Sequence, residues 1–202
     1  HATESEAIEE ATRMLGVYTD FAWETLAIPV VPGIKSATER FAGADETYTI
    51  EAMMQNGWAL QAGTSHFLGQ NFAKAFDVTF QSAEGTLEHV WATSWGVSTR
   101  LVGAVIMAHS DDIGLVLPPK VAPIQVVLVP IWRKDEDKNR VMAFAQDVQA
   151  RLGPHFRVHL DDREKMKPGA KYFEWERKGV PLRLEIGPRD VANNSAFAAR
   201  RI

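Results

Sequence analysis

Apolar side chains recur with a helical period over the first 26 residues of the chain. Thr3 and Glu6, just before this pattern, have the spacing of a capping box, in which each residue caps the backbone of the other. The pattern predicts a long amphipathic helix from about Glu4 to about Leu26. The prolines within residues 28–33 end it, because proline lacks a backbone donor and disfavours helix in the residue before it.

Alternation with a period of two replaces the helical period after this point. Asn56 and Gly57 form a turn signal between two such stretches, which is typical of a β-hairpin. Up to residue 109 the pattern predicts, in order, strands at 46–54 and 58–61, a helix at 64–75, short strands at 78–80 and 91–94, and an apolar helix at 99–109.

The pattern changes again beyond Pro118 and Pro119, which form a stiff connector and predict a domain boundary. Strands are expected at 124–131, 156–160, 182–186 and 196–200, and helices at 139–152 and 171–178. The apolar run at 124–131 is continuous, as in strands that are buried on both faces. The second part is therefore expected to be an α/β unit with a parallel or mixed sheet.

The composition excludes several classes of protein and of site but adds no further element to this prediction. The chain has 202 residues, of which 46% are hydrophobic and 24% charged, and these values are typical of a globular protein. The absence of cysteine excludes a disulfide scaffold, thiolate catalysis and cysteine-based zinc sites within these residues. A formal net charge of −4 argues against nucleic-acid binding through bulk charge. No apolar run reaches the roughly 18 to 20 residues of a membrane span, and a cytoplasmic protein is expected.

Two segments, 59–72 and 94–107, place polar side chains beside glycines where a core element would need bulk. Such a combination suits a site where backbone must approach a ligand closely. The two segments are predicted to form two walls of one polar pocket. The polar side chains concerned are Gln61, Thr64, Ser65, His66, Ser98, Thr99 and Arg100.

Three residues of these segments allow more than one interpretation. Ser65 beside His66 suggests a hydrolase, but neighbours in sequence seldom aim at each other and no G-x-S-x-G motif surrounds the serine. A ligand-lining segment or a structural polar cluster is the better interpretation of the pair. Arg100 opposes the dipole of the helix that it begins, so it indicates either an anionic ligand or an ion pair with a carboxylate.

Other charged segments are expected to have simpler roles. His-Ser-Asp-Asp at 109–112 lies where a helix end is predicted and favours a turn over a metal site. Asp135, Glu136 and Asp137 lie between Lys134 and Lys138 and predict a solvated loop, and the same interpretation extends to Asp161 and Asp162. Residues 173–190 mix aromatics, arginines and acids, which suits single-stranded RNA, although a charged sheet edge would look similar.

Taken together, these segments resemble prolyl-tRNA synthetases of the archaeal and eukaryotic-like type. The match includes F-A-G-A-D from Phe41, A-L-Q-A-G-T-S-H from Ala59, S-W-G-V-S-T-R from Ser94, and W-E-R-K-G-V-P-L-R-L-E-I-G-P-R-D from Trp175. The resemblance implies that residues 1–119 are the later part of an α+β class II catalytic domain, built on an antiparallel sheet, with the third signature motif at 94–107. Residues 120–202 would be an α/β anticodon-binding domain, truncated at its C-terminus.

The resemblance also implies roles for individual residues. Gln61, Thr64, Ser98 and Arg100 would bind ATP, and Phe41, Thr64, His66 and Ser94 would line the proline pocket. Glu176, Arg183, Arg189 and Asp190 would read the two guanines of the anticodon. The implied activity is that of a proline–tRNA ligase that uses ATP and Mg²⁺, acts on proline and tRNA(Pro), forms a homodimer and has no metal ligands among its own site residues.

Two of the three signature motifs are not found in the chain. The resemblance places the first, used in dimerisation, and the second, which binds ATP and proline, upstream of His1. Residues 1–202 alone are therefore expected to be catalytically inactive. The alternative is a synthetase-derived module that binds tRNA or regulates without catalysis. It would not need the nucleotide residues, so the presence of Gln61, Thr64, Ser98 and Arg100 counts against it.

Overall fold

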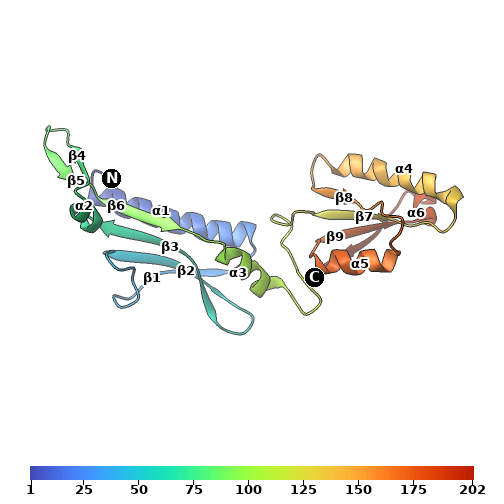
Figure 1. The fold of residues 1–202 in the computed structure, drawn as a ribbon, viewed down its shortest axis with the longest axis horizontal. Coiled ribbons are helices and arrows are strands. Elements are labelled where there is room, and N and C mark those ends of the chain that lie inside the picture. Colours follow the sequence, from blue (N-terminus) through green and yellow to red (C-terminus); the bar gives the residue numbers. More distant parts are fainter. The chain divides into compact units, whose positions relative to one another are not determined.

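The computed structural model describes the whole chain, residues 1–202 (Figure 1). It contains two compact units, His1–Ala108 and His109–Ile202. The division between them falls before the predicted connector at Pro118 and Pro119. Each unit is described by itself below.

The first unit begins with the predicted amphipathic helix. Helix α1 (Glu4–Asp20) continues into one turn of π-helix, η1 (Phe21–Thr25), so the predicted helix is confirmed. Its capping box is also formed, because Thr3 Oγ1 accepts from Glu6 N at 3.3 Å and Glu6 Oε2 accepts from Thr3 N at 3.1 Å. These bonds satisfy two of the backbone donors that a helix start leaves unpaired.

A four-stranded antiparallel sheet packs against this helix. Its strands are β1 (Val30–Ile34), β2 (Glu46–Met53), β3 (Ala59–Gly69) and β6 (Ala92–Gly96), in the order β1-β2-β3-β6. Helix α1 buries one face of the sheet, where Tyr48 and Phe67 pack with Ala7 and Ala11. The small alanines let the helix approach the aromatic rings closely. The opposite face of the sheet carries polar side chains.

Strand β3 differs from the prediction, because residues 64–69 are strand and not helix. Their burial follows a strand period, with Ser65 and Phe67 buried and Thr64 and His66 only partly buried. Pairing with β2 on one side and β6 on the other supplies the backbone hydrogen bonds that a helix would have made. The helix is confined to α2 (Asn71–Phe76).

The other predicted elements of the first unit appear in the predicted order, and the strand at Leu87–His89 was not predicted. The turn at Asn56 and Gly57 is confirmed, with Met54 N donating to Trp58 O at 2.8 Å and Gly57 at φ +81°. The remaining elements are the hairpin of β4 (Thr79–Gln81) and β5 (Leu87–His89) and the helix α3 (Arg100–His109).

The second unit is an α/β fold with a mixed sheet, as predicted. Its strands are β7 (Val126–Pro130), β8 (Val158–Leu160), β9 (Leu182–Ile186) and β10 (Phe197–Arg200), and its helices are α4 (Asp135–Leu152), α5 (Pro168–Arg177) and α6 (Pro188–Ala192). The strand order is β10-β9-β7-β8, with β7 parallel to β8 and β9, and β10 antiparallel to β9. The continuous apolar run of β7 is buried on both faces. Val127 and Val129 pack against Trp175 of α5, while Ile186 of β9 packs against Val141 of α4.

Two predictions of solvated loops in this unit are wrong in part, because residues 135–137 are at least partly exposed but helical and Asp161 is buried. Asp135, Glu136 and Asp137 form the first turn of α4, where their charges favour the positive end of the helix dipole. Asp161 is only 1% exposed, and its carboxylate accepts from Arg163 Nη2 at 2.7 Å and Trp175 Nε1 at 2.8 Å. Its neighbour Asp162 is exposed, as predicted.

No helix of the structure is both long enough and apolar enough to cross a membrane.

Candidate functional sites

The polar face of the first sheet gathers side chains from three strands. Thr47 of β2 pairs in register with His66 of β3, which pairs with Ser94 of β6, while Thr49 pairs with Thr64. Residues directly opposite each other in an antiparallel sheet point to the same side. The structure therefore brings together three of the four residues expected around proline: Thr64, His66 and Ser94.

A β-bulge adds Gln61 to the same face. Ile50 pairs with Gly63 and Glu51 with Gln61, so Ala62 is an extra residue in β3. Ala62 is buried in the core against Ile50. Without the bulge, Gln61 would point to the face opposite Thr64, because side chains alternate along a strand. With it, Gln61 reaches the polar face, where Lys35 Nζ donates to Gln61 Oε1.

The four residues expected to bind ATP line one cavity of about 320 Å³. Its lining consists of Gln61, Ala62, Gly63, Thr64, Gly96, Val97, Ser98 and Arg100. Arg100 Nη1 donates to Gln61 O at 3.2 Å, and Ser98 Oγ accepts from Arg100 N at 3.2 Å at the start of α3. Arg100 is exposed and forms no ion pair within residues 1–202, so the ion-pair interpretation of this arginine is wrong. Its charge is free to meet an anion in the cavity.

His66 is held next to Phe41 by a buried threonine. The two rings are 4.9 Å apart between centroids, and Thr47 Oγ1 lies 3.0 Å from both His66 Nδ1 and Phe41 N. Burial lowers the pKa of His66 below its ordinary value, and the Lys35 cation lowers it further. The imidazole is therefore neutral near pH 7. Thr47 escaped the sequence analysis, and only its register opposite His66 reveals its role.

Ser65 lies on the other face of the strand from His66. Its side chain is fully buried, and Oγ donates to Ala11 O of α1 at 2.8 Å. The hydroxyl therefore joins the sheet to the helix and cannot reach the His66 imidazole. The serine-nucleophile interpretation is wrong, because neighbouring residues of a strand point to opposite faces.

We expect Ser65→Ala to lower the free energy of unfolding by about 1 kcal/mol, the usual value of one buried hydrogen bond. Urea denaturation of the variant and the parent protein would measure the difference. Incubation with an organofluorophosphate, followed by mass spectrometry, provides the chemical control. Covalent labelling of Ser65 in the folded protein would contradict its structural role.

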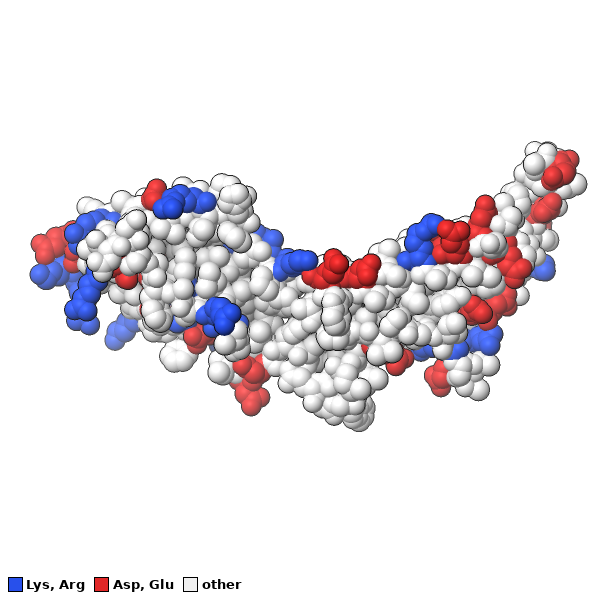
Figure 2. All heavy atoms as spheres, turned by 180° about the vertical axis from the view of Figure 1, so that it is seen from behind, with Lys and Arg blue, Asp and Glu red and all other residues white.

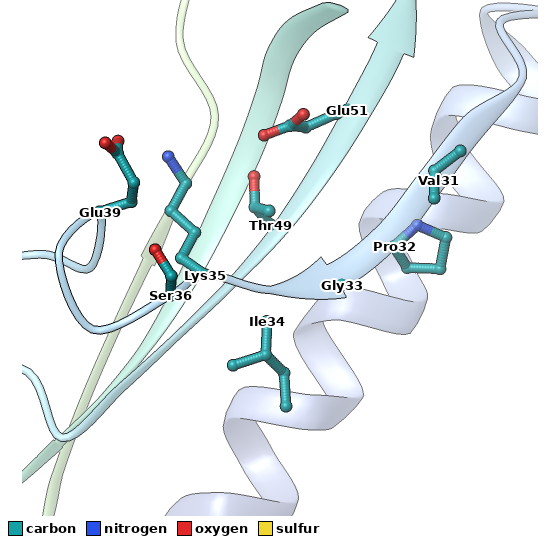
Figure 3. Close-up of a pocket in the computed structure, with 9 residues that line it drawn as sticks. All are labelled: Val31, Pro32, Gly33, Ile34, Lys35, Ser36, Glu39, Thr49 and Glu51. Carbon is teal, nitrogen blue, oxygen red and sulfur yellow. The ribbon is translucent and has the colours of Figure 1, made fainter.

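A second hollow, of about 340 Å³, is lined by residues of β1 and β2 and by Lys35, whose Nζ donates to Gln61 of the first cavity. Figure 3 shows the polar ends of Lys35, Glu39 and Glu51 directed toward one another, whereas Ile34 points away from them. Glu51 forms no ion pair within the chain and lies opposite Gln61 in the sheet. The polar face thus offers both a cation and carboxylates within a short distance of the cavity that Arg100 lines.

In the second unit, Arg183 of β9 is the centre of a cluster of charged side chains. Its Nη1 donates to Glu176 Oε1 at 2.8 Å and its Nε to Glu185 Oε1 at 3.1 Å. Its guanidinium carbon lies 4.2 Å from the centroid of the Tyr172 ring. The structure therefore brings Glu176 and Arg183 together as expected and adds Tyr172 and Glu185. Residues 183 and 185 share one face of β9, which is the only sign of Glu185 in the sequence.

Arg189 and Asp190 lie apart from this cluster, beyond the other end of β9. Asp190 Oδ2 accepts from Gly187 N at 2.8 Å and so caps helix α6, while Arg189 is exposed and forms no ion pair in the chain. The four residues expected to contact the anticodon thus form two pairs, and no contact joins the pairs. One of the four, Asp190, has a structural role in addition.

The turn at residues 109–112 is held by an ion pair. Arg201 Nη1 donates to Asp111 Oδ2 at 3.0 Å, and hydrogen bonds from Arg201 lower the pKa of Asp111 to about 2. The carboxylate therefore keeps its charge at neutral pH and stabilises the C-terminal end of the second unit.

Charge on the surface is mixed. On the face seen in Figure 2, basic and acidic side chains lie interspersed over both units, and neither sign forms a continuous patch. A nucleic acid binding here would depend on particular side chains and not on a broad basic surface.

Comparisons with known proteins agree with the arrangement in the second unit. Residues 125–201 match the family model described as an anticodon binding domain. The whole chain is 61% identical to the proline–tRNA ligase of Flavobacterium psychrophilum and 62% identical to that of Flavobacterium johnsoniae, covering 41% of each. It is 56% identical to the proline–tRNA ligase of Chloroflexus aurantiacus, covering 42% of that protein. The chain thus spans about two-fifths of the length of these relatives.

Proposed function

The chain belongs to the prolyl-tRNA synthetase family, and from that premise we propose that its protein activates proline with ATP to prolyl-adenylate and transfers the prolyl group to tRNA(Pro). In this proposal the first unit is part of a class II catalytic domain, and its polar sheet face forms the floor of the site. The second unit binds the anticodon. Homodimerisation and a cytoplasmic location belong to the same proposal.

The arrangement of the polar face suits adenylate formation. In that step a carboxylate oxygen of proline attacks the α-phosphorus of ATP and pyrophosphate leaves. The protein must position two anionic reactants and neutralise charge, and it needs no nucleophile of its own. Arg100, with no anionic partner in the chain, is placed to hold the phosphates, and Gln61, Thr64 and Ser98 lie around it.

Proline would bind on the same face, next to the phosphates. Phe41 and His66 form a wall whose ring centroids are 4.9 Å apart. A compact, largely apolar ring fits against Phe41, and the neutral imidazole offers a hydrogen bond without repelling the imino group. Thr64 lies between this wall and Arg100, consistent with contacts to both substrates. Ser94, in register with His66, would complete the pocket.

Mg²⁺ fits this site as a companion of ATP. Magnesium in nucleotide sites is held mainly by phosphate oxygens and water, with one or two oxygens from the protein. Glu51, opposite Gln61 and without an ion pair in the chain, could supply such an oxygen. The ion would neutralise phosphate charge when bound, while Arg100 and Gln61 position the nucleotide.

One observation carries the proposal most directly. The residues expected to bind ATP come from β3, from the start of α3 and from the turn before it, yet they line a single cavity beside the His66 wall. A stand-alone tRNA-binding module would not need this cavity, so that alternative is not favoured. Proline-dependent exchange of pyrophosphate into ATP by the full-length protein tests the proposal, and exchange with another amino acid but not with proline would overturn it.

The role of the second unit is tested by Arg183→Ala in the full-length protein. Loss of an arginine that contacts a guanine should weaken tRNA(Pro) recognition by about 1 to 3 kcal/mol, while proline activation stays nearly unchanged. The ratio kcat/KM for aminoacylation measures the first effect and pyrophosphate exchange the second. Arg151→Ala, on the exposed side of α4, is a matched control. An equal loss in both assays would mean that Arg183 is structural.

A further inference from the structure

We propose that Glu185 and Tyr172 hold Arg183 so that a guanine base meets two particular atoms, Nη2 of Arg183 and Oε2 of Glu176. This inference rests on the proposed function in one respect, namely that the Glu176–Arg183 pair reads an anticodon guanine. It assigns different roles to the two carboxylates of the cluster: Glu185 positions the arginine, and Glu176 contacts the base.

Both oxygens of Glu185 already accept hydrogen bonds within the cluster. Its Oε1 accepts from Arg183 Nε at 3.1 Å, and its Oε2 accepts from Tyr172 Oη at 2.8 Å. Its side chain is only 18% exposed, against 35% for Glu176. Both bonds lie within the cluster, so Glu185 acts on the guanidinium and the phenol and not on a base.

Tyr172 restricts the plane of the same guanidinium. The Arg183 guanidinium carbon lies 4.2 Å from the ring centroid, a distance at which the cation is attracted to the face of the ring. Burial raises the pKa of Tyr172 above its ordinary value, and its hydrogen bond to Glu185 raises it further, so the hydroxyl remains a donor. Ring and carboxylate together leave the arginine one orientation.

Within this ion pair, one guanidinium nitrogen and one carboxylate oxygen have no hydrogen-bond partner. Arg183 uses Nε and Nη1 within the cluster, and Nη2 donates to no atom of residues 1–202. Glu176 uses Oε1, and Oε2 accepts from no atom of the chain. The crevice beside them has a volume of only about 10 Å³, room for no more than one water. A base therefore has to meet these atoms edge-on from the surface.

The paired donor and acceptor match the Watson–Crick edge of guanine. Guanine O6 accepts and its N1–H donates, so O6 can bond to Arg183 Nη2 while N1–H bonds to Glu176 Oε2. Adenine presents a donor and an acceptor in the reverse order, and both contacts become repulsive. The edge is accessible only in an unpaired base, which agrees with recognition of a single-stranded anticodon.

A positioning role for Glu185 and a general electrostatic effect predict opposite results when its charge is removed. The cluster holds two carboxylates and one guanidinium, so removing one carboxylate charge should by itself favour the approach of RNA phosphates. If Glu185 positions Arg183, its neutralisation should instead weaken selection of guanine.

The test is Glu185→Gln and Tyr172→Phe in the full-length protein. The measurement is the ratio of aminoacylation kcat/KM for tRNA(Pro) with guanine to that for tRNA(Pro) with adenine, taken at each of the two anticodon guanines. At one of them we expect the ratio to fall about tenfold for Glu185→Gln and about threefold for Tyr172→Phe. Glu164→Gln, which removes a carboxylate from the exposed pair with Lys138, should leave it unchanged.

Two other outcomes separate the inference from the function on which it rests. If Glu176→Gln lowers the ratio while Glu185→Gln and Tyr172→Phe do not, the cluster reads guanine but the positioning role is wrong. If neither Glu176→Gln nor Arg183→Ala changes the ratio, the cluster does not read the anticodon, and its assignment in the proposed function fails together with this inference.

Discussion

Arg100→Ala in the full-length protein is expected to reduce proline-dependent pyrophosphate exchange by about 100- to 1,000-fold, the usual effect of removing a preorganised donor to a developing anion. Arg100 lies at the start of α3, lines the cavity with Gln61 and has no anionic partner in the chain. A guanidinium that is left unpaired beside a cavity has no structural ion pair to lose, so its main interaction is with the ligand. Steady-state exchange kinetics at varied ATP would measure the effect.

Arg100→Ala should change the free energy of unfolding much less than it changes the exchange activity. A cation at the start of a helix opposes the helix dipole by about 0.3 to 1 kcal/mol, and its removal relieves that repulsion. The hydrogen bond from Arg100 Nη1 to Gln61 O, at 3.2 Å, offsets this by a similar amount. We therefore expect the free energy of unfolding to change by less than about 1 kcal/mol. Arg13→Ala, on the exposed side of α1, is the control, and an equal loss of exchange there would contradict a specific role for Arg100.

How far the sequence predicts the polar face can be judged from β3. Its residues were expected to line a pocket, and Thr64, His66 and Gln61 do share one face. The expected helix at 64–75 was wrong for residues 64–69, because glycines and small polar residues weaken the period of two that marks a strand. Even a correct prediction of a regular strand over these residues would have placed Gln61 and Thr64 on opposite faces of the sheet. The bulge at Ala62 depends on how β2 and β3 pair, which a single segment of sequence does not contain.

In the second unit, the burial of Asp161 also depends on contacts between distant segments of the sequence. Two neighbouring aspartates after a short strand are typical of a solvated turn, and Asp162 is one. The partners of Asp161 that bury it, Lys171 and Trp175, come from α5, so only the packing of that helix reveals them. Local periodicity, by contrast, was sufficient for β7, because a parallel strand that is buried on both faces is a continuous apolar run.

Asp161→Ala is expected to lower the free energy of unfolding of the second unit by about 3 to 5 kcal/mol, the usual effect of removing one partner from a buried ion pair. Lys171 Nζ lies 3.4 Å from the Asp161 carboxylate, and its side chain is only 3% exposed. Without the carboxylate, Lys171 would keep one hydrogen bond, to Asp161 O at 2.8 Å, and a buried charge with no counterion. Urea denaturation of the full-length protein, followed by hydrogen exchange in α5, would measure the loss.

Neighbouring and compensating variants separate this effect from a general disturbance of the turn. Asp162→Ala changes the next residue, which is exposed, and should alter stability by less than about 0.5 kcal/mol. The double variant Asp161→Asn with Lys171→Met removes both charges and should recover part of the loss, because a buried pair replaced as a whole costs less than a pair broken on one side. Equal effects of Asp161→Ala and Asp162→Ala would contradict the buried-pair account.

The pH dependence of stability provides a second, independent test of the role of Asp161. Burial acts to raise the pKa of Asp161, but hydrogen bonds from Arg163 and Trp175 and the Lys171 charge outweigh it, so the pKa lies well below the ordinary value. A carboxylate with a lowered pKa stabilises the folded state fully above its unfolded pKa of about 4, and this contribution is lost as the pH falls toward the folded pKa. The difference in stability between the parent protein and Asp161→Ala should therefore be constant from about pH 6 to 8 and shrink below about pH 4. A difference that instead grew on acidification would mean that Asp161 is protonated in the folded protein, and Lys171 would then have to find its counterion elsewhere.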